Sequence, residues 1–163
     1  MIYENLITTW VRIIKEILPE HKIIREEGAV GEGSVRPNEK FVTIKLISGP
    51  RDYSIREGKR FNSEDKMELF STKAFTLSIN AYREGAMDAI LDIKMQLDNP
   101  DYIDKLKNQG SISVTNNGAG TDLSQQIETG WVERFQCDIS FAVGFTAQTE
   151  IGIIESANVE RSA

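Results

Sequence analysis

A nearly unbroken alternation of apolar and polar residues runs from residue 130 to residue 146. Its odd positions are mostly apolar and comprise Trp131, Phe135, Cys137, Ile139, Phe141, Val143 and Phe145. A period of two is typical of a β-strand with one buried face. At about 3.3 Å per residue, the run would extend roughly 50 Å, about three times the length of an ordinary strand. We therefore expect the longest strand of an antiparallel sheet here, and we expect part of it to extend beyond its own core toward a neighbouring subunit.

Helical spacing occurs in three other segments. Apolar residues separated by three or four positions predict helices over residues 3–18, 86–98 and 100–108. Asn99 and the proline after it provide an N-cap and a first helical position for the third helix. Gly110 stands where a left-handed C-terminal cap is expected.

The remaining elements follow from alternation and from turn-forming residues. Strands are predicted over residues 21–26, 41–47, 66–83, 111–115 and, less regularly, 150–160. Loops or turns are predicted over residues 28–37, 48–65 and 116–120, and one helical turn over residues 123–127. No internal repeat or low-complexity tract divides the chain.

The order of these elements predicts an α+β fold in one domain spanning residues 1–163. Its mostly antiparallel sheet would carry the N-terminal helix and the central helix, residues 86–98, on one face. A length of 163 residues with 40% hydrophobic residues is ordinary for one globular domain with a real core. We expect one apolar layer made of Trp10, Ile13, Leu77, Ile79, Ile90, Ile93, Phe135 and Ile139. In the third helix, Ile103 and Leu106 are expected to face inward.

The segment over residues 49–65 is long for a connection inside a compact domain. It carries mixed charges and glycines, and it has no apolar period. Two interpretations stay open: a mobile, solvated hairpin tip, or an extended arm that becomes ordered against a partner. The candidate subunit or partner contacts in such an arm are Arg51, Arg56, Lys59, Arg60 and Phe61. The final residues, 156–163, are expected to form a loose tail.

No arrangement of residues predicts catalysis, a bound cofactor or a metal site. His21 is the single histidine, and neither a CxxC nor an HExxH spacing occurs. The glycine-rich stretch 28–33 lacks the lysine and hydroxyl residue of a phosphate-binding loop. Asp88 and Asp92 are expected on a solvated helix face, and the single cysteine, Cys137, on the buried face of the long strand. A structural or binding role is therefore favoured over an enzyme.

Charge and hydropathy narrow the class of partner. A net charge of −6 argues against wrapping nucleic acid, because DNA binding depends on Lys and Arg neutralising phosphates. No apolar run approaches the ~20 residues that span a bilayer, and the N-terminal sequence lacks the pattern of a signal peptide. We therefore expect no membrane association, and a reducing cytoplasm is the favoured compartment.

Several short stretches form a recognisable order after the N-terminal helix. They are residues 41–44 (FVTI), 75–82 (FTLSINAY), 85–86 (GA), 122–124 (DLS), 131–139 (WVERFQCDI) and 154–156 (IES). In their order and spacing, and over nearly the whole chain, they resemble the neck or tail terminator proteins of tailed bacteriophages. The resemblance implies a ring, usually six-fold, that caps the finished tail tube and joins it to the head connector. It implies no catalytic residues.

The same resemblance implies partners and a location. The chain would contact copies of itself in a homo-hexameric ring, the tail tube protein, a sheath protein where the tail has one, and the head–tail connector. DNA would pass through the ring without specific binding. The protein would be found at the tail neck of the virion after assembly in the host bacterial cytoplasm. Two alternatives stay open: a head-completion or tail-tube-like phage protein, and a small α+β ligand-binding protein or enzyme.

Overall fold

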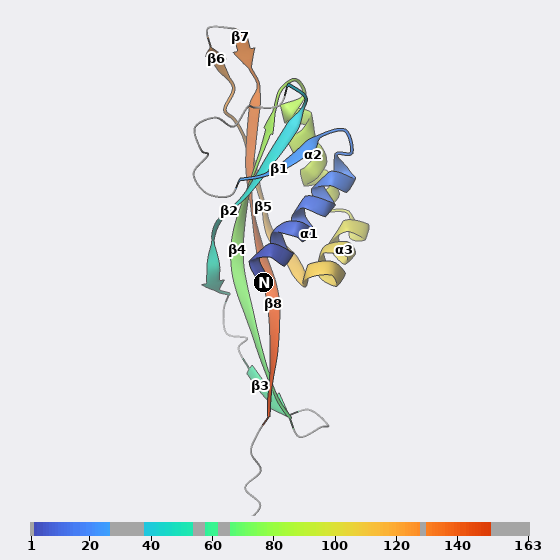
Figure 1. The fold of residues 1–163 in the computed structure, drawn as a ribbon, viewed down its shortest axis with the longest axis vertical. Coiled ribbons are helices and arrows are strands. Elements are labelled where there is room, and N and C mark those ends of the chain that lie inside the picture. Colours follow the sequence, from blue (N-terminus) through green and yellow to red (C-terminus); the bar gives the residue numbers. More distant parts are fainter. Residues whose placement is uncertain (1, 27–37, 54–57, 62–65, 128–129, 151–163) are drawn as a thin grey trace, which may run out of the picture.

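The computed structural model describes residues 2–26, 38–53, 58–61, 66–127 and 130–150, which form an elongated molecule (Figure 1). In chain order the elements are α1 (Ile2–Ile17), β1 (Lys22–Arg25), β2 (Phe41–Asp52), β3 (Gly58–Phe61), β4 (Lys66–Tyr82), α2 (Ala86–Leu97), α3 (Pro100–Gly110), β5 (Ile112–Asp122), β6 (Gln125–Ile127), β7 (Gly130–Val132) and β8 (Arg134–Glu150). The predicted loop over residues 28–37, the strand predicted beyond residue 150 and the loose tail over residues 156–163 lie outside the described ranges.

The described strands form one six-stranded sheet and one two-stranded sheet. In the larger sheet the order is β1-β2-β4-β8-β5, and β3 pairs with β4 beside this path. β1 and β2 are parallel, whereas the other pairs are antiparallel. β4 and β8 have 17 residues each and pair along their whole lengths, from Lys66 opposite Glu150 to Tyr82 opposite Arg134. The predicted α+β fold with a mostly antiparallel sheet is confirmed.

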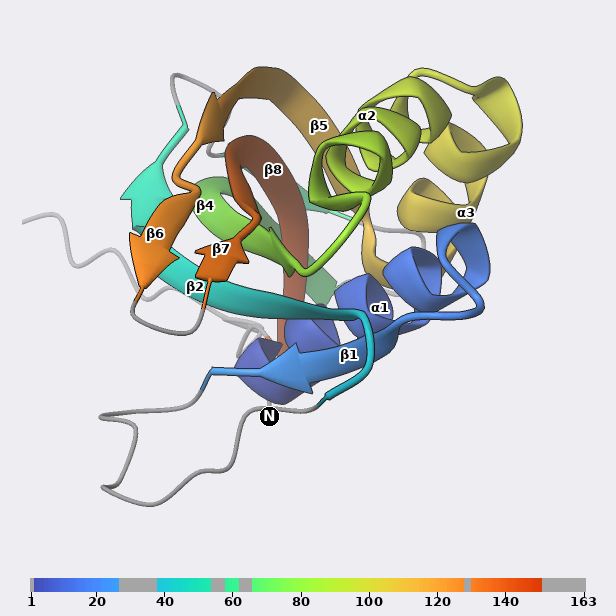
Figure 2. The ribbon, with the colours of Figure 1, turned by 90° about the horizontal axis from the view of Figure 1, so that it is seen from above.

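The described helices all cover the same face of this sheet, as the view along the long axis shows (Figure 2). The prediction placed α1 and α2 on this face, and α3 joins them. The buried residues of α2 recur at helical spacing and are Ala86, Ala89, Ile90, Ile93 and Leu97. In α3, Leu106 is buried as predicted, but the inward placement of Ile103 is wrong because this side chain is 47% exposed. α3 contributes a narrower buried stripe than α2.

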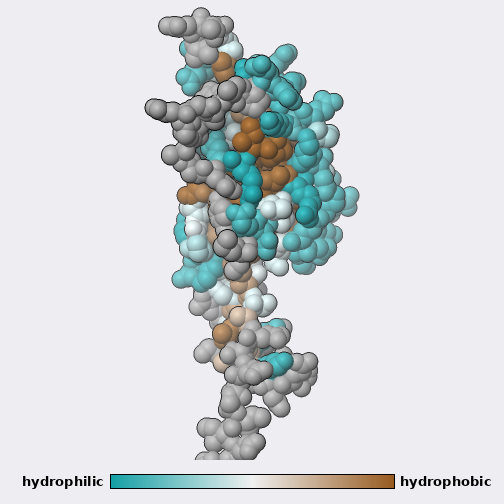
Figure 3. All heavy atoms as spheres, viewed as in Figure 1, coloured by the Kyte–Doolittle hydropathy of each residue, from teal (hydrophilic) through white to brown (hydrophobic). Residues whose placement is uncertain are grey.

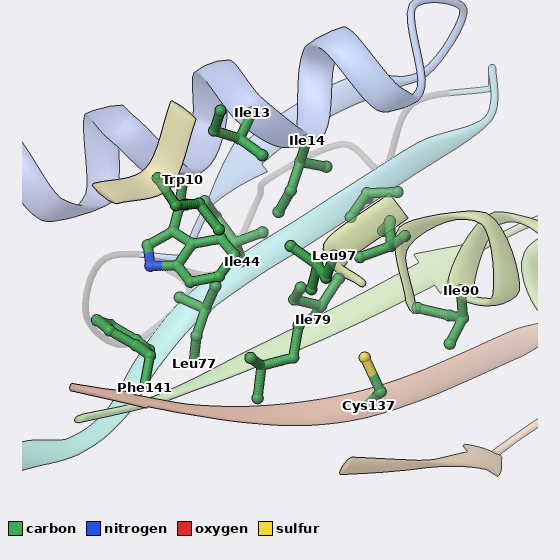
Figure 4. Close-up of a cluster of buried hydrophobic side chains, with 14 of the residues drawn as sticks. Trp10, Ile13, Ile14, Ile44, Leu77, Ile79, Ile90, Leu97, Cys137 and Phe141 are labelled. Carbon is green, nitrogen blue, oxygen red and sulfur yellow. The ribbon is translucent and has the colours of Figure 1, made fainter. Parts of the chain in front are cut away.

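The hydrophobic core lies between the helices and the sheet (Figure 4). Trp10 of α1 is fully buried, and the centroid of its ring lies 5.2 Å from that of Phe141 in an edge contact. Phe141 in turn stacks on Phe75, with 5.6 Å between the ring centroids. The residues predicted to form one apolar layer are all buried except Phe135, which is half-buried and packs against the core from near the start of β8.

The two ends of α3 differ in how well they were predicted. At the N-terminus, the side chain of Asn99 accepts a hydrogen bond from the N–H of Asp101 at 3.0 Å, which confirms the predicted cap. At the C-terminus, the helix continues through Gly110, and Ser111 adopts the left-handed conformation with φ 53°. A Cβ on Gly110 would lie 2.8 Å from the side chain of Ile112. The glycine therefore permits a close approach of the next strand rather than the cap itself.

The turn predicted over residues 116–120 is wrong, because these residues belong to β5. The glycines and asparagines there are accommodated by two register shifts against β8 instead of by a reversal of the chain. At one of them, Gly118 lies against the backbone of Asp138, and a Cβ on Gly118 would collide with the carbonyl oxygen of Asp138. Glycine in a strand often marks such a close approach.

The long strand predicted over residues 130–146 is divided at Glu133. The N–H of Arg83 donates to the carbonyl oxygen of Glu133, and the N–H of Gly85 donates to its carboxylate, both at 3.1 Å. These bonds hold Glu133 against the turn that precedes α2. β8 begins at the next residue and continues the sheet, whereas β7 departs from it.

β7 pairs with β6, and this small hairpin replaces the helical turn predicted over residues 123–127. The hairpin is separate from the main sheet and protrudes from the upper end of the molecule (Figure 1). Trp131 was predicted on the buried face of the long strand, but its side chain is 64% exposed. The alternation was continuous in the sequence, yet only the β8 part of it faces the helices.

Replacing Phe141 with Ala tests the packing of the core. Large-to-small changes at buried Phe residues lower the free energy of unfolding by about 3–5 kcal/mol, and Phe141 contacts both Trp10 and Phe75. Chemical denaturation should show a loss of this size. The control is Met95→Ala, because Met95 is 72% exposed and surface changes usually stay within about 0.5 kcal/mol. Equal stability of the two variants would contradict the placement of Phe141.

Two glycines in β5 provide a second test. Gly118→Ala should destabilise the protein because the added methyl group meets a backbone oxygen that cannot move aside. Gly120→Ala is the matched control, since a Cβ there has its nearest neighbour, the side chain of Ile90, at 3.6 Å. Melting temperatures should therefore fall clearly for the first variant and little for the second. The opposite order would show that the register of β5 on β8 is different.

Candidate assembly surfaces

The lower part of the sheet extends past the hydrophobic core. Buried positions of β4 begin at Phe75, and the described buried positions of β8 end at Val143. Beyond them, residues 66–72 of β4 pair with residues 144–150 of β8, and β3 pairs with the other edge of β4. We call these three segments the distal ribbon (Figure 1). The expectation that the long strand extends beyond its own core is confirmed.

One edge of the distal ribbon has no strand partner among the described residues. β5 pairs with β8 only as far as Val143, and the N–H of Gly144 donates the last backbone bond to Ser111 at 3.2 Å. Backbone groups along a strand alternate in direction, so those of every second residue beyond Gly144 point to the same open side. An unpaired edge of this kind is a template for pairing with another chain.

The structure places most of the predicted contact residues on or beside this ribbon. Arg51 lies near the end of β2, is exposed, and donates to the hydroxyl of Thr76 at 3.4 Å. Lys59, Arg60 and Phe61 lie in β3, opposite Leu69, Glu68 and Met67 of β4 respectively. Arg56 lies outside the described residues. Whether these residues contact a partner stays a prediction.

The segment predicted as an open connection over residues 48–65 is strand where it includes the end of β2 and all of β3. The sequence did not predict these strands, because glycine and proline, here Gly49 and Pro50, usually interrupt a strand. Here they lie beyond Ile44, where the pairing of β1 with β2 stops, so none of the described strands on that side requires the missing N–H of Pro50. Two register shifts, on either side of Ser48, absorb the irregular backbone.

An apolar groove of about 460 Å³ lies where the distal ribbon joins the core. Its lining comes from α1, β2, β4 and β8 and comprises Leu6, Leu46, Ile47, Ser48, Gly49, Pro50, Lys73, Phe75 and Phe145. The rings of Phe75 and Phe145 meet edge to face at 6.5 Å between centroids. The amine of Lys73 pairs with the carboxylate of Asp52 at 2.5 Å beside the groove. We call this feature the apolar groove.

Other large apolar side chains are exposed outside the groove. Trp131 is exposed on the β6–β7 hairpin, and Met87, Leu91 and Met95 follow one another at four-residue spacing along the outer side of α2. Figure 3 shows a surface that is mainly hydrophilic over the helices, with patches of hydrophobic surface between them and again low on the molecule at the level of β3. Apolar residues gathered on a surface often mark contacts with other proteins.

The described residues hold no cluster of three or more His, Cys, Asp or Glu side chains that could bind a metal. Partial burial, and then the charge of Lys40, lowers the pKa of His21 below its ordinary value. Asp88 and Asp92 are exposed on α2, as predicted. Among the described helices, none is long and apolar enough to cross a membrane.

The buried position of Cys137 gives a chemical test of the fold. Burial raises the pKa of its thiol to about 11, which leaves roughly one thiol in a thousand ionised at pH 8. The native protein should therefore react very slowly with a thiol reagent, and the unfolded protein should react rapidly. A Met95→Cys variant should show one fast thiol and one slow thiol. Rapid labelling of the unmodified native protein would contradict the inward orientation of Cys137.

Comparison with known proteins identifies the family. The family model for the phage neck terminator protein matches residues 4–162, which is nearly the whole chain. The protein therefore belongs to this family of phage structural proteins and is a component of a virion tail, and the resemblance found in the sequence is confirmed. Tail terminator is the function class that the family defines.

A solved structure gives a more distant likeness. The sheath/tube terminator of an extracellular contractile injection system, PVC, in its extended state, is 9% identical, and the match covers 96% of this chain. The chain spans 64% of the length of that protein, and the TM-score is 0.36. A score this low is not evidence of shared architecture. No curated protein matches the sequence.

Proposed function

We propose that this protein forms a ring at the head-proximal end of the phage tail, where it ends polymerisation of the tail tube and then joins the tail to the head connector. The observation that carries the proposal is the family match over residues 4–162. The ring that we propose is a homo-hexamer, with residues 1–163 acting as one domain in each subunit. Its other partners are the tail tube protein and, in a contractile tail, the sheath protein.

The form of the subunit supports a role in assembly. The distal ribbon extends beyond the described helices, and along residues 144–150 of β8 one edge has no partner strand in the part of the chain that the structure describes. The apolar groove, where the distal ribbon joins the core, and the exposed Trp131 lie at different places on the same chain. Different patches that meet on neighbouring copies make heterologous contacts, and such contacts close into a ring when the rotation between subunits allows it.

We propose that DNA passes through the opening of the ring without specific binding. The net charge of −6 supports this because a protein that grips DNA neutralises its phosphates with Lys and Arg. Like charges repel over distances near the Debye length, about 8 Å at physiological salt. A passage without a basic lining lets the duplex slide during filling of the head and during ejection.

Deleting the gene in the producing phage tests the function directly. Because nothing would then stop the tube or prepare it for docking, lysates should contain filled heads that are separate from tails. The tails should have uncontrolled lengths or bare ends in electron micrographs. Supplying the intact gene in trans should restore joined particles of uniform length.

Two outcomes of the deletion would overturn the proposal. Normal tails attached to heads would mean that the protein is not needed to end or join the tail. A complete failure to start tails would indicate a role in the tube itself, which is the tail-tube-like alternative.

Hydrogen exchange tests whether the distal ribbon takes part in assembly. Amides of β3 and of residues 144–150 should exchange rapidly in the free subunit and slow down by roughly tenfold or more in the ring. Amides in the middle of α2 are the internal control and should change little, since their bonds lie within one helix over the core. Unchanged exchange along the distal ribbon in assembled rings would exclude it from the subunit contacts.

A further inference from the structure

The β6–β7 hairpin continues the pairing of β5 with β8 beyond the core. Asp122 of β5 lies opposite Phe135 of β8, and Gln125 of β6 lies opposite Val132 of β7. The step between these two pairs is three residues along each strand, so the register is the same on both sides of the break. β6 and β7 nevertheless form a sheet of their own, which protrudes from the upper end of the molecule (Figure 1). The hairpin therefore leaves the core as a two-stranded ribbon.

The bonding between the two strands is irregular at the base of this hairpin. The N–H of Leu123 donates to the carbonyl oxygen of Arg134 at 2.8 Å. The N–H of Arg134 donates to the hydroxyl oxygen of Ser124 at 3.1 Å, and the N–H of Ser124 donates to the carboxylate of Asp122 at 2.9 Å. Side chains thus supply part of the bonding at this level. Two-stranded ribbons twist more than wider sheets, and two-stranded hairpins are marginally stable alone. We therefore expect the base to be the place where the hairpin bends.

Glu133 supplies a further support at the same level, because it bonds to the turn before α2. Its carbonyl oxygen accepts a hydrogen bond from the N–H of Arg83, and its half-buried carboxylate accepts one from the N–H of Gly85, both at 3.1 Å. Gly85 is the N-cap residue of α2 and, as glycine, has no side chain with which to cap the helix. The partial positive charge at a helix N-terminus favours a carboxylate there. The Glu133 carboxylate therefore joins the hairpin base to the start of α2.

The turn that receives these bonds is a fixed anchor. Arg83 and Gly85 have φ angles of 80° and 81°, in the left-handed region. A residue other than glycine rarely adopts this conformation, and it persists only where the surrounding structure holds it. The N–H of Ala86, a buried residue, closes the turn by donating to the carbonyl oxygen of Arg83 at 3.1 Å. A bond from Glu133 to this turn therefore limits the directions that the hairpin can take.

We propose that Glu133 is a positioning residue that fixes the direction of the β6–β7 hairpin, because its carboxylate accepts the hydrogen bond that ties the hairpin base to the turn before α2. This latch determines where the exposed Trp131 stands relative to the core. It acts within one chain and does not depend on a ring, so the purified protein is sufficient to test it.

The distance between two spin labels tests the latch. Gln126→Cys places one label on the hairpin, and Thr8→Cys places the other at an exposed position of α1. The native Cys137 is buried and is not labelled under the same conditions. Pulsed double electron–electron resonance should give one narrow distance distribution. Adding Glu133→Ala should broaden the distribution by roughly twofold or more, since the marginally stable hairpin would then be held by its two strands alone.

Two further variants make the result specific. Glu133→Gln should keep the distribution narrow, because the amide oxygen of glutamine still accepts a hydrogen bond from the N–H of Gly85. Glu84→Ala is the matched control and should also keep it narrow. Glu84 is an exposed carboxylate in the same turn, and among the described residues it makes no hydrogen bond to the hairpin.

A separate measurement shows whether the Glu133→Ala protein is folded. Cys137 of the unlabelled variant should react with a thiol reagent as slowly as in the unmodified protein, because the core around it is unchanged. Should this variant unfold, Glu133→Asp gives the same test. Its shorter side chain withdraws the carboxylate from Gly85 while the charge is kept, so the distribution should again broaden.

The distributions decide between the latch and the strands as the source of the hairpin direction. Broadening by Glu133→Ala, with narrow distributions for Glu133→Gln and Glu84→Ala, supports the latch. A broad distribution with Glu133 intact overturns it, because the hairpin would then have no fixed direction. A distribution that stays narrow in folded Glu133→Ala or Glu133→Asp protein also overturns it, since the pairing of β5 with β8 would then be sufficient. Equal broadening by Glu133→Gln would exclude the hydrogen bond to Gly85 as the cause and overturn the proposal as well.

Discussion

The full-length pairing of β4 with β8 is the constraint on which the rest of the structure depends. Each strand has 17 residues, and their register is continuous from one end to the other. On the upper half, alternate side chains of both strands face the helices and form the core with Trp10 and its neighbours. On the lower half the pairing of β4 with β8 continues beyond the described helices. One pair of strands therefore supplies both the folded core and an extension from it.

This arrangement leaves surfaces that the described residues do not cover. The unpaired edge of β8, the apolar groove and the Trp131 hairpin are distributed along the length of the subunit rather than gathered in one pocket. A catalytic site concentrates reactive groups in one place, whereas an assembling subunit needs separate contacts for separate neighbours. The chain belongs to the phage neck terminator family, which implies that it associates with other components of the tail.

The sequence predicted the elements whose residues follow a regular period and failed where a local irregularity decided the path. The spacing of Ile90 and Ile93 marked α2, and the alternation from Cys137 to Val143 marked the core half of β8. The break at Glu133 depends on bonds to a turn almost 50 residues earlier, and periodicity within one strand carries no signal for them. The sequence predicted a loop at Gly49 and a turn at Gly118, but both residues lie in strands. Glycine is typical of turns, and its close approach to a neighbouring strand becomes evident only when that strand is known. The apolar groove combines four distant segments, so no short motif predicts it.

An electron cryo-microscopy reconstruction of the head-proximal end of purified tails tests the central claim most directly. The account predicts a closed ring of this chain, six-fold in symmetry, seated on the last layer of the tube, with the β4–β8 pair traceable in each subunit and an open central channel. A tail end without this protein would contradict the account. So would density that places the chain repeatedly along the tube instead of once at its end.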